Sequence, residues 1–329
     1  MSAQDGHDLL ADSAGLTQQN AQEPNAHSRG LELFKDVLST KNLHTVTLLH
    51  RGRFATVWLT KEQDGEDEYA CKVVDVNSYT FYLQHCHSTM TYKNEIEILR
   101  ECEHINILSD VEYIERPGWT LLMTKFMLGS SLVEHVNMLG SFAAEAGRRL
   151  VQQIGDALRY LRSQQILHRD IKPGNVLLTD CDRERMIVKL ADFGFSRHCN
   201  NTQSCFTIIG TPEYMAPEMW QLRKRDNHAQ SDGYTWTVDL WSFGLLLYAV
   251  FTGGEPFDDG IHSVSMGMTT FAYDEEEWSM LPIAKDFVQR LLTVSPSDRA
   301  CMLGSTYNGE ETMDRRVARK LSGVSICNM

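Results

Sequence analysis

The succession of hydrophobic patterns along the chain restricts its fold more than any other feature of the sequence. Between residues 43 and 126, short runs dense in β-branched and aromatic residues predict strands. After Gly129 apolar residues recur at helical spacing, most clearly in the amphipathic stretch 143–163. Strands followed by helices predict an α+β chain of two lobes, joined near residues 125–129. The individual strands are expected at 45–60, 69–75, 107–114, 121–126, 176–178 and 187–190, and the other helices at 94–102, 238–251 and 283–292.

Composition narrows the class of protein. The chain has 329 residues, of which 42% are hydrophobic and 23% charged, as in a globular protein with a sizeable core. A formal net charge of -13 argues against binding to nucleic acid or to an anionic membrane. The eight cysteines show no C-x-x-C spacing, and no secretory signal pattern opens the sequence. We therefore expect a reducing compartment, the cytoplasm or the nucleus.

The two ends differ from the middle of the chain. Residues 1–40 are rich in Gln, Asn, Ala, Ser and Asp, which predicts a disordered polar segment with at most a short helix at 31–35. Residues 304–329 are expected to form a tail.

Five sequence features that carry chemistry follow one another in order. They are a strand-flanked loop around Gly52, the segment Ala70-Cys71-Lys72, the segment His168-Arg169-Asp170-Ile171-Lys172-Pro173-Gly174-Asn175, and the tripeptides Asp192-Phe193-Gly194 and Ala216-Pro217-Glu218. Each is weak alone, but the H-R-D-x-x-x-x-N spacing followed by the two tripeptides is specific. In this order they resemble the eukaryotic protein kinase superfamily, over residues 43–303.

The resemblance implies a two-lobed kinase fold. The N-lobe, residues 43–125, would hold an antiparallel β-sheet and one helix, and residues 125–129 would form the hinge. The C-lobe, residues 130–303, would be mainly helical. Lys172 and the segment 210–218 resemble the Ser/Thr branch, and within it the calmodulin-dependent and checkpoint-type kinases are the most similar.

The resemblance also implies roles in transferring the γ-phosphate of ATP to Ser or Thr hydroxyls of protein substrates. This chemistry depends on positioning and charge neutralisation. Lys72 would hold the α- and β-phosphates and pair with Glu95. Asp170 would act as the catalytic base, Lys172 would reach the γ-phosphate, and Thr211 would hydrogen-bond both Asp170 and Lys172.

Cofactor binding follows from the same resemblance. Asn175 and Asp192 would bind Mg²⁺. An apolar slot would hold the adenine, and the hinge backbone would hydrogen-bond to it. The expected ATP-binding residues are Leu49, Gly52, Phe54, Val57, Ala70, Lys72, Glu95, Thr124, Lys125, Met127, Leu177 and Asp192.

Regulation is expected in the segment 192–218, which resembles an activation loop. Thr207 matches the usual phosphorylated position, and Arg169 and Arg197 would bind its phosphate. An upstream kinase or a second copy of the chain would add that phosphate.

Three further residues of the motifs are expected to be structural. Glu218 would pair with Arg299 as a buried ion pair. Asp239 would brace the backbone of the catalytic loop.

The sequence gives little information about the preferred peptide substrate. Arg-directed kinases place carboxylates at three positions that correspond to Ser131, Gly174 and Ala249, and none is acidic here. We therefore expect no strong Arg requirement before the acceptor. Ile208, Pro212 and Met215 would form an apolar pocket for the residue after it. Residues 221–233 resemble an exposed insertion.

Two other functions remain open. A pseudokinase scaffold is suggested by the glycine loop, where His50 and Ala55 replace two of three expected glycines. Against it stands the full set of catalytic residues. The segment 210–218, which resembles a peptide-binding platform, argues against a small-molecule phosphotransferase.

Overall fold

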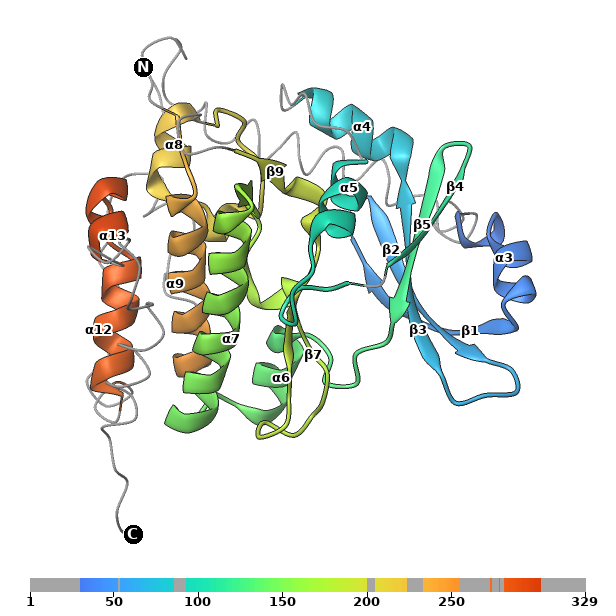
Figure 1. Cartoon of the computed structure of the whole chain (residues 1–329), viewed down its shortest axis with the longest axis horizontal. Helices are drawn as coiled ribbons and strands as arrows, with labels where there is room; N and C mark the ends of the chain where they lie inside the picture. The colour runs from blue at the N-terminus through green and yellow to red at the C-terminus, as the bar shows by residue number, and fades with distance from the viewer. Residues whose placement is uncertain are drawn as a thin grey trace. The chain divides into compact units, whose positions relative to one another are not determined.

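Figure 1 shows the computed structural model of the chain, which describes residues 30–52, 54–85, 93–109, 111–199, 205–223, 233–254, 273, 278 and 281–302. The chain divides into two compact units. The first comprises residues 1–85 and 110–126, and the second comprises residues 86–109 and 127–329. The first is built around an antiparallel sheet and the second mainly from helices, so the predicted two-lobed α+β fold is confirmed.

The sheet of the first unit has two chemically different faces. Its strands follow in the order β1 (Leu43–Arg51), β2 (Ala55–Glu62), β3 (Glu68–Asp75), β5 (Trp119–Lys125) and β4 (Glu112–Arg116). Residues opposite each other in antiparallel strands share a face, and the side chains alternate along each strand. Trp58, Cys71 and Met123 therefore lie on one face, while Val57, Lys72 and Leu122 lie on the other.

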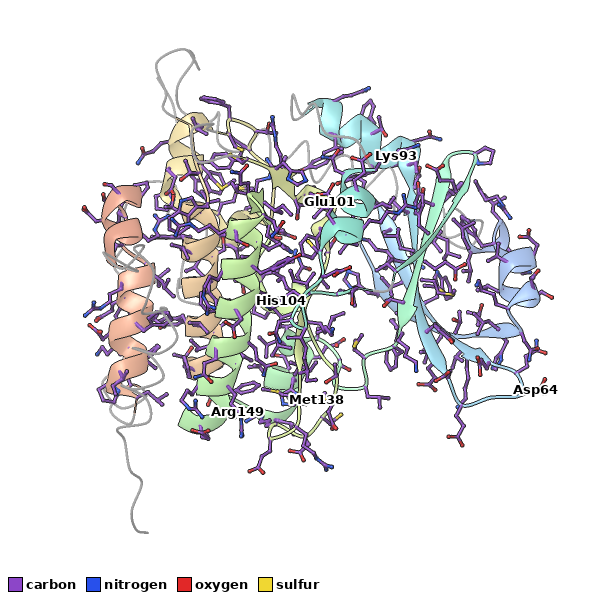
Figure 2. All side chains as sticks on the ribbon, in the orientation of Figure 1. Asp64, Lys93, Glu101, His104, Met138 and Arg149 are labelled. Carbon is purple, nitrogen blue, oxygen red and sulfur yellow. The ribbon has the colours of Figure 1, made fainter. Side chains whose placement is uncertain are left out.

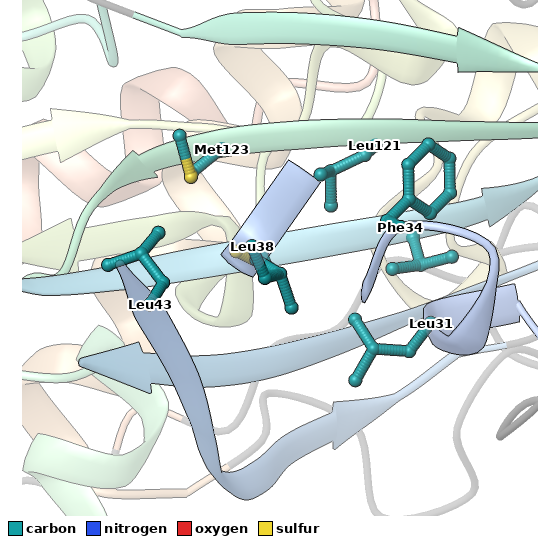
Figure 3. Packing of buried hydrophobic residues seen from close by; sticks show 8 residues of the cluster. Leu31, Phe34, Leu38, Leu43, Leu121 and Met123 are labelled. Carbon is teal, nitrogen blue, oxygen red and sulfur yellow. The ribbon is translucent and has the colours of Figure 1, made fainter. Parts of the chain in front are cut away.

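A short helix covers the first of these faces. Helix α3 (Lys35–Thr40) follows a helical turn at residues 30–32. Leu31, Phe34 and Leu38 pack with Cys71, Leu121 and Met123 of the sheet, and the Phe34 side chain is fully buried (Figure 3). This corrects the expectation of disorder for residues 30–40; residues 1–29 lie outside the described part. Three apolar residues at helical spacing are enough to stabilise this short segment, because the sheet supplies the apolar surface against which they pack.

Most of the helices that the structure describes belong to the second unit. They are α5 (Asn94–Glu101), α6 (Leu132–Leu139), α7 (Ala144–Ser163), α8 (Pro217–Arg223), α9 (Thr237–Thr252), α12 (Pro282–Leu291) and α13 (Pro296–Met302). Almost every residue of α9 is buried, as expected of a helix that is apolar on all sides. It packs against α7 and α12, which lie beside it in Figure 1.

The loops of the second unit contain short paired strands and single-turn helices. They are β6 (Ile166–Leu167) paired with β9 (Arg197–His198), β7 (Val176–Leu178) paired with β8 (Val188–Leu190), and the single-turn helices η1 (Pro173–Asn175), η2 (Phe193–Phe195) and η3 (Pro212–Tyr214).

Two details differ from the sequence predictions, and one part of them falls outside the described residues. The predicted strand 107–114 is wrong in extent, because β4 begins at Glu112 and Ile107 makes only an isolated bridge with Leu190. Helix α5 groups with the second unit, whereas α3 and α4 (Val76–His85) belong to the first. Residues 224–232 of the predicted insertion and the tail 304–329 lie outside the described residues.

Within the described parts of the chain, no helix combines the length and the apolar character needed to cross a membrane.

Replacing Phe34 with alanine should test whether α3 belongs to the folded core. The Phe34 ring is 0% exposed, and removing a buried aromatic ring costs about 3–5 kcal/mol of unfolding free energy. The matched control is Leu33→Ala, since Leu33 is 45% exposed in the same segment and its loss should change stability by no more than about 0.5 kcal/mol. Denaturant unfolding measures both. Equal stability of the two variants would show that α3 does not stabilise the sheet.

Candidate active site

Asp239 anchors the catalytic loop from helix α9. Its Oδ2 accepts the backbone N–H of His168 and its Oδ1 accepts the backbone N–H of Arg169, both at 2.8 Å. The carboxyl group is buried, which raises its pKa, while the two backbone donors act in the opposite direction. The predicted bracing role of Asp239 is therefore confirmed as hydrogen bonding.

The buried, neutral imidazole of His168 supports the catalytic loop. Its Nδ1 accepts the backbone N–H of Asp170, so Nε2 carries the proton and donates to the carbonyl oxygen of Ala191 at 3.1 Å. Its ring lies edge-on to Phe193, with 4.7 Å between the ring centroids. Complete burial lowers its pKa, which agrees with the neutral form.

Three polar side chains meet around Asp170. Thr211 Oγ1 donates to Asp170 Oδ1 at 2.6 Å, and Lys172 Nζ donates to Thr211 Oγ1 and lies 3.0 Å from Asp170 Oδ2. Asn175 Nδ2 donates to both the backbone oxygen and Oδ2 of Asp170, at 2.8 Å each. The predicted hydrogen bonds of Thr211 are confirmed. The cluster fixes the rotamer of a carboxylate that is almost fully buried.

The backbone around this cluster adopts sparsely populated conformations. Arg169 and Asp192 have φ of 67° and 62°, in the left-handed region that costs a non-glycine residue about 1–2 kcal/mol. Gly210 has φ of 120°, and a Cβ there would lie 2.5 Å from the carbonyl oxygen of Arg169. Glycine is thus required immediately before Thr211.

A buried ion pair between Glu218 and Arg299 lies at the C-terminal end of the segment 192–218. Arg299 Nη1 and Nη2 donate to the two carboxylate oxygens of Glu218 at 2.8 and 3.1 Å. Arg299 also donates to the carbonyl oxygens of Thr237, Thr293 and Val294. The predicted pair is confirmed, although its partners are 81 residues apart in the chain.

Arg169 contacts the activation segment through a tyrosine. Arg169 Nε donates to the carbonyl oxygen of Phe195 at 2.7 Å, and Nη1 donates to the Tyr234 hydroxyl at 3.1 Å. The Tyr234 hydroxyl in turn donates to the carbonyl oxygen of Thr207. Sequence reasoning missed Tyr234; its signal was its place five residues before Asp239.

The start of the segment is attached to helix α5. His198 Nε2 lies 3.0 Å from a carboxylate oxygen of Glu101, which stands at the end of α5 in Figure 2. Nearby, the ring of His104 stacks on Tyr160 of α7, with 5.0 Å between centroids. The contact of His198 with Glu101, together with the pairing of β9 with β6, positions Arg197 in the second unit.

The first unit contributes the predicted nucleotide residues on the sheet face that α3 does not cover. Lys72 lies opposite Val57 and Leu122, and Ala70 lies opposite Thr124, so all share that face. The side chains of Val57, Ala70, Lys72 and Thr124 are each half-buried.

The glycine loop differs in part from its expected form. Gly52 donates its N–H to the Ala55 carbonyl oxygen at 2.8 Å, and a Cβ at Gly52 would meet that oxygen at 3.4 Å, an ordinary contact. The chain itself therefore does not demand glycine there. The Phe54 ring packs against Tyr79 and Tyr82 of α4, with centroids 5.4 and 4.9 Å away, so capping a phosphate would require it to leave this cluster.

The other predicted site residues are divided between the units. Leu49 is exposed on β1, and Lys125 is exposed and lies 3.3 Å from Asp67. Glu95 is buried on α5, while Met127 and Leu177 are half-buried in the second unit. The Lys72–Glu95 pair joins residues of different units and stays a prediction.

Comparison with known proteins agrees with this geometry. A catalytic loop braced by a buried aspartate, followed by an Asp-Phe-Gly turn, defines a phosphotransferase of the kinase class. The model of the protein kinase domain matches residues 43–305. The chain therefore belongs to the eukaryotic protein kinase superfamily, in its Ser/Thr branch. Membership implies ATP as the phosphoryl donor and a divalent metal ion.

Individual relatives are similar over more than three quarters of the chain. The probable serine/threonine-protein kinase fhkE of Dictyostelium discoideum is 34% identical over 77% of this chain and 35% of its own length. Serine/threonine-protein kinase H1 of Homo sapiens is 31% identical over 78% of this chain and 58% of its own. The meiosis-specific serine/threonine-protein kinase mek1 of Schizosaccharomyces pombe is 30% identical over 78% and 56%. The chain thus spans between about a third and three fifths of these curated relatives.

Replacing Asp239 with asparagine should displace the catalytic loop. The amide would turn an N–H₂ group toward a backbone N–H, leaving a buried donor unsatisfied at a cost of about 1–3 kcal/mol. We expect lower stability and a fall in kcat with a smaller change in KM for ATP. Asp286→Asn is the control, since Asp286 pairs with Arg290 on the surface. An unchanged kcat in Asp239→Asn would contradict the bracing role.

Proposed function

We propose that the chain transfers the γ-phosphate of ATP to Ser and Thr hydroxyls of protein substrates, with Mg²⁺ as the metal. The observation that carries the proposal is the cluster of Asp170, Lys172, Asn175 and Thr211. A scaffold protein has no physical need for a buried carboxylate that is hydrogen-bonded by three side chains.

Each residue of the cluster has a distinct task in the proposal. Asp170 accepts the proton of the substrate hydroxyl, and Thr211 and Asn175 hold its carboxylate in one orientation. Lys172 places a positive charge beside it, where the transferring phosphoryl group develops negative charge. Lys72 holds the α- and β-phosphates as a point charge. The combination of Lys172 and Thr211 favours Ser and Thr over Tyr as acceptors.

The metal ligands fit a magnesium ion that ATP itself helps to bind. Asn175 uses its amide N–H₂ group on Asp170, which leaves the amide oxygen as its metal-binding atom, and Asp192 offers an exposed carboxylate. Both are the hard oxygen ligands that Mg²⁺ prefers. Among the described residues no three His, Cys, Asp or Glu side chains gather as a metal cluster. Phosphate oxygens and water would therefore complete the coordination shell, and the ion would neutralise phosphate charge.

The sheet face that carries Lys72 in the first unit supports the proposed nucleotide binding by the residues that it presents. Val57 and Ala70 present apolar side chains beside Lys72, so an adenine ring and its phosphates could lie along one strand pair. The proposed ATP-binding set is completed by Leu49, Gly52 and Phe54 of the glycine loop, Thr124 of β5, Lys125 and Met127 of the hinge region, and Glu95, Leu177 and Asp192. The five cysteines whose side chains the structure describes are free thiols, which supports a reducing compartment, the cytoplasm or the nucleus.

The pseudokinase alternative rests on His50 and Ala55. His50 is exposed, and its ring lies beside Gly52, 3.7 Å from the position of a Cβ. A histidine side chain at this position takes up space in the loop between β1 and β2. This would weaken nucleotide binding without affecting Asp170.

A transfer assay decides between the two functions. The purified chain is incubated with Mg²⁺, γ-labelled ATP and a generic protein substrate, and the labelled amino acids are identified. We expect phosphoserine and phosphothreonine, with a loss of kcat of at least about 100-fold in Asp170→Asn. Lys72→Ala should also lose activity, whereas Lys61→Ala, a surface lysine on β2, should not. A folded chain that labels nothing would favour the scaffold.

We also propose that phosphorylation of Thr207 raises activity. Thr207 is half-buried, whereas Ser196, another hydroxyl of the segment, is fully buried and donates to the His168 carbonyl oxygen. Arg169 already reaches the Thr207 backbone through Tyr234. A phosphate there would gain charge-assisted hydrogen bonds from Arg169 and Arg197.

Thr207→Ala should therefore lower kcat/KM at least about tenfold, equal to about 1.4 kcal/mol of transition-state stabilisation. The control Thr202→Ala should retain full activity. Phosphopeptide mapping of the wild type and of Asp170→Asn, each incubated alone with ATP, separates self-phosphorylation from an upstream kinase. Full activity in Thr207→Ala would contradict the proposal.

A further inference from the structure

Two cysteines of the activation segment lie side by side. Cys199 and Cys205 are six positions apart in the sequence, and their thiols are hydrogen-bonded to each other. Their exposed fractions are 7% and 2%. Both are free cysteines in the structure. Neither has a role in the proposed phosphoryl transfer.

The framework of the second unit holds both residues in place. Cys199 donates its backbone N–H to the Gln165 carbonyl oxygen at 2.7 Å. Cys205 exchanges two backbone hydrogen bonds with Tyr234, at 2.8 and 2.9 Å. Because each backbone is fixed independently, joining the two sulfur atoms costs little further conformational entropy.

Two guanidinium groups favour a thiolate in this pair. The hydrogen bond donated by Cys199, together with the charges of Arg169 and Arg197, lowers the pKa of Cys205 to about 6, although burial and Asp239 oppose this. The same hydrogen bond and burial raise the pKa of Cys199. The hydrogen bond and the two guanidinium groups thus favour a thiolate on Cys205 and a thiol on Cys199. A thiolate beside cations is the reactive form of cysteine.

The remaining thiols are chemically different. Burial raises the pKa of Cys71, and it raises the pKa of Cys102 to about 11. Cys181 is exposed, and its thiol donates to the Leu128 carbonyl oxygen. If reactivity depends on thiolate character, Cys199 and Cys205 should therefore react before Cys71 and Cys102. If it depends on exposure, Cys181 should react first.

We propose that Cys199 and Cys205 are an oxidation site that hydrogen peroxide converts to an intramolecular disulfide. The thiolate attacks one peroxide oxygen, so that an S–O bond forms, the O–O bond breaks and hydroxide leaves as water after taking a proton. The second thiol then attacks the sulfenic sulfur, so that the S–S bond forms, the S–O bond breaks and a second water leaves. The two sulfurs lose two electrons in total, and the peroxide gains them.

The disulfide would act on the region of the predicted phosphorylation site. It removes a negative charge beside Arg169 and Arg197, the two cations expected to bind phospho-Thr207. It also links Cys199 covalently to the residue that pairs with Tyr234, whose hydroxyl contacts Thr207. A reducing compartment would restore the thiols, which makes the modification reversible.

Mass spectrometry of the full chain tests the proposal without any measurement of kinase activity. The native protein is treated with increasing hydrogen peroxide, denatured in N-ethylmaleimide and digested with trypsin. Both cysteines fall in one tryptic peptide, residues 198–223, which contains no internal Lys or Arg. We expect this peptide to lose two hydrogen atoms and its maleimide labels at the lowest peroxide concentration, and dithiothreitol to restore both.

Two variants complete the test. Cys199→Ser should block the disulfide and leave a sulfenic acid on Cys205 that dimedone traps, whereas Cys181→Ser should leave peroxide sensitivity of the 198–223 peptide unchanged. Maleimide labels on both cysteines after peroxide has oxidised Cys181 would overturn the proposal. So would a disulfide that forms only after denaturation. Inactivity of the chain as a kinase would leave these outcomes unaffected, so the two proposals fail separately.

Discussion

The two hydrogen bonds that Asp239 accepts from the backbone of the catalytic loop determine how the rest of the site is arranged. A buried carboxylate is costly unless its oxygens are occupied, and each oxygen here accepts one backbone donor at 2.8 Å. Because α9 is buried on all sides, Asp239 cannot shift without disturbing the core. The loop that carries Asp170 therefore takes its position from the packing of an apolar helix 70 residues further along the chain.

That anchor makes unfavourable backbone conformations possible nearby. Arg169 and Asp192 both have positive φ, and Gly210 approaches the Arg169 carbonyl so closely that no side chain fits. Such strain persists only where surrounding contacts over-determine the conformation. Asp239 supplies those contacts for Arg169, and the edge-on contact between the rings of His168 and Phe193 links the loop to the Asp-Phe-Gly turn. Arg169 and Asp192 lie in or beside the segments that present the two carboxylates, so the strain there bears directly on the site.

The sequence was informative where chemistry requires particular residue types at particular spacings. The partners Asp170–Thr211 and Glu218–Arg299 could be predicted because an ordered set of motifs identifies them, despite their separation in the chain. The packing of Phe34 could not, since its partners are set by strand register rather than by neighbours in sequence. The contact between Cys199 and Cys205 also escaped prediction, because it depends on the backbone pairing of Cys205 with Tyr234.

Strand register also connects helix α3 with the proposed nucleotide site. Cys71 and Lys72 are neighbours on β3, and they point to opposite faces of the sheet. Cys71 packs in the apolar cluster with Phe34, while Lys72 shares the other face with Val57. A shift of β3 by one residue would bring the Lys72 ammonium under α3 and turn Cys71 toward Val57. Burying an unpaired ammonium among apolar side chains is strongly unfavourable. The cluster under α3 therefore selects the one register that presents Lys72 on the face proposed to bind ATP.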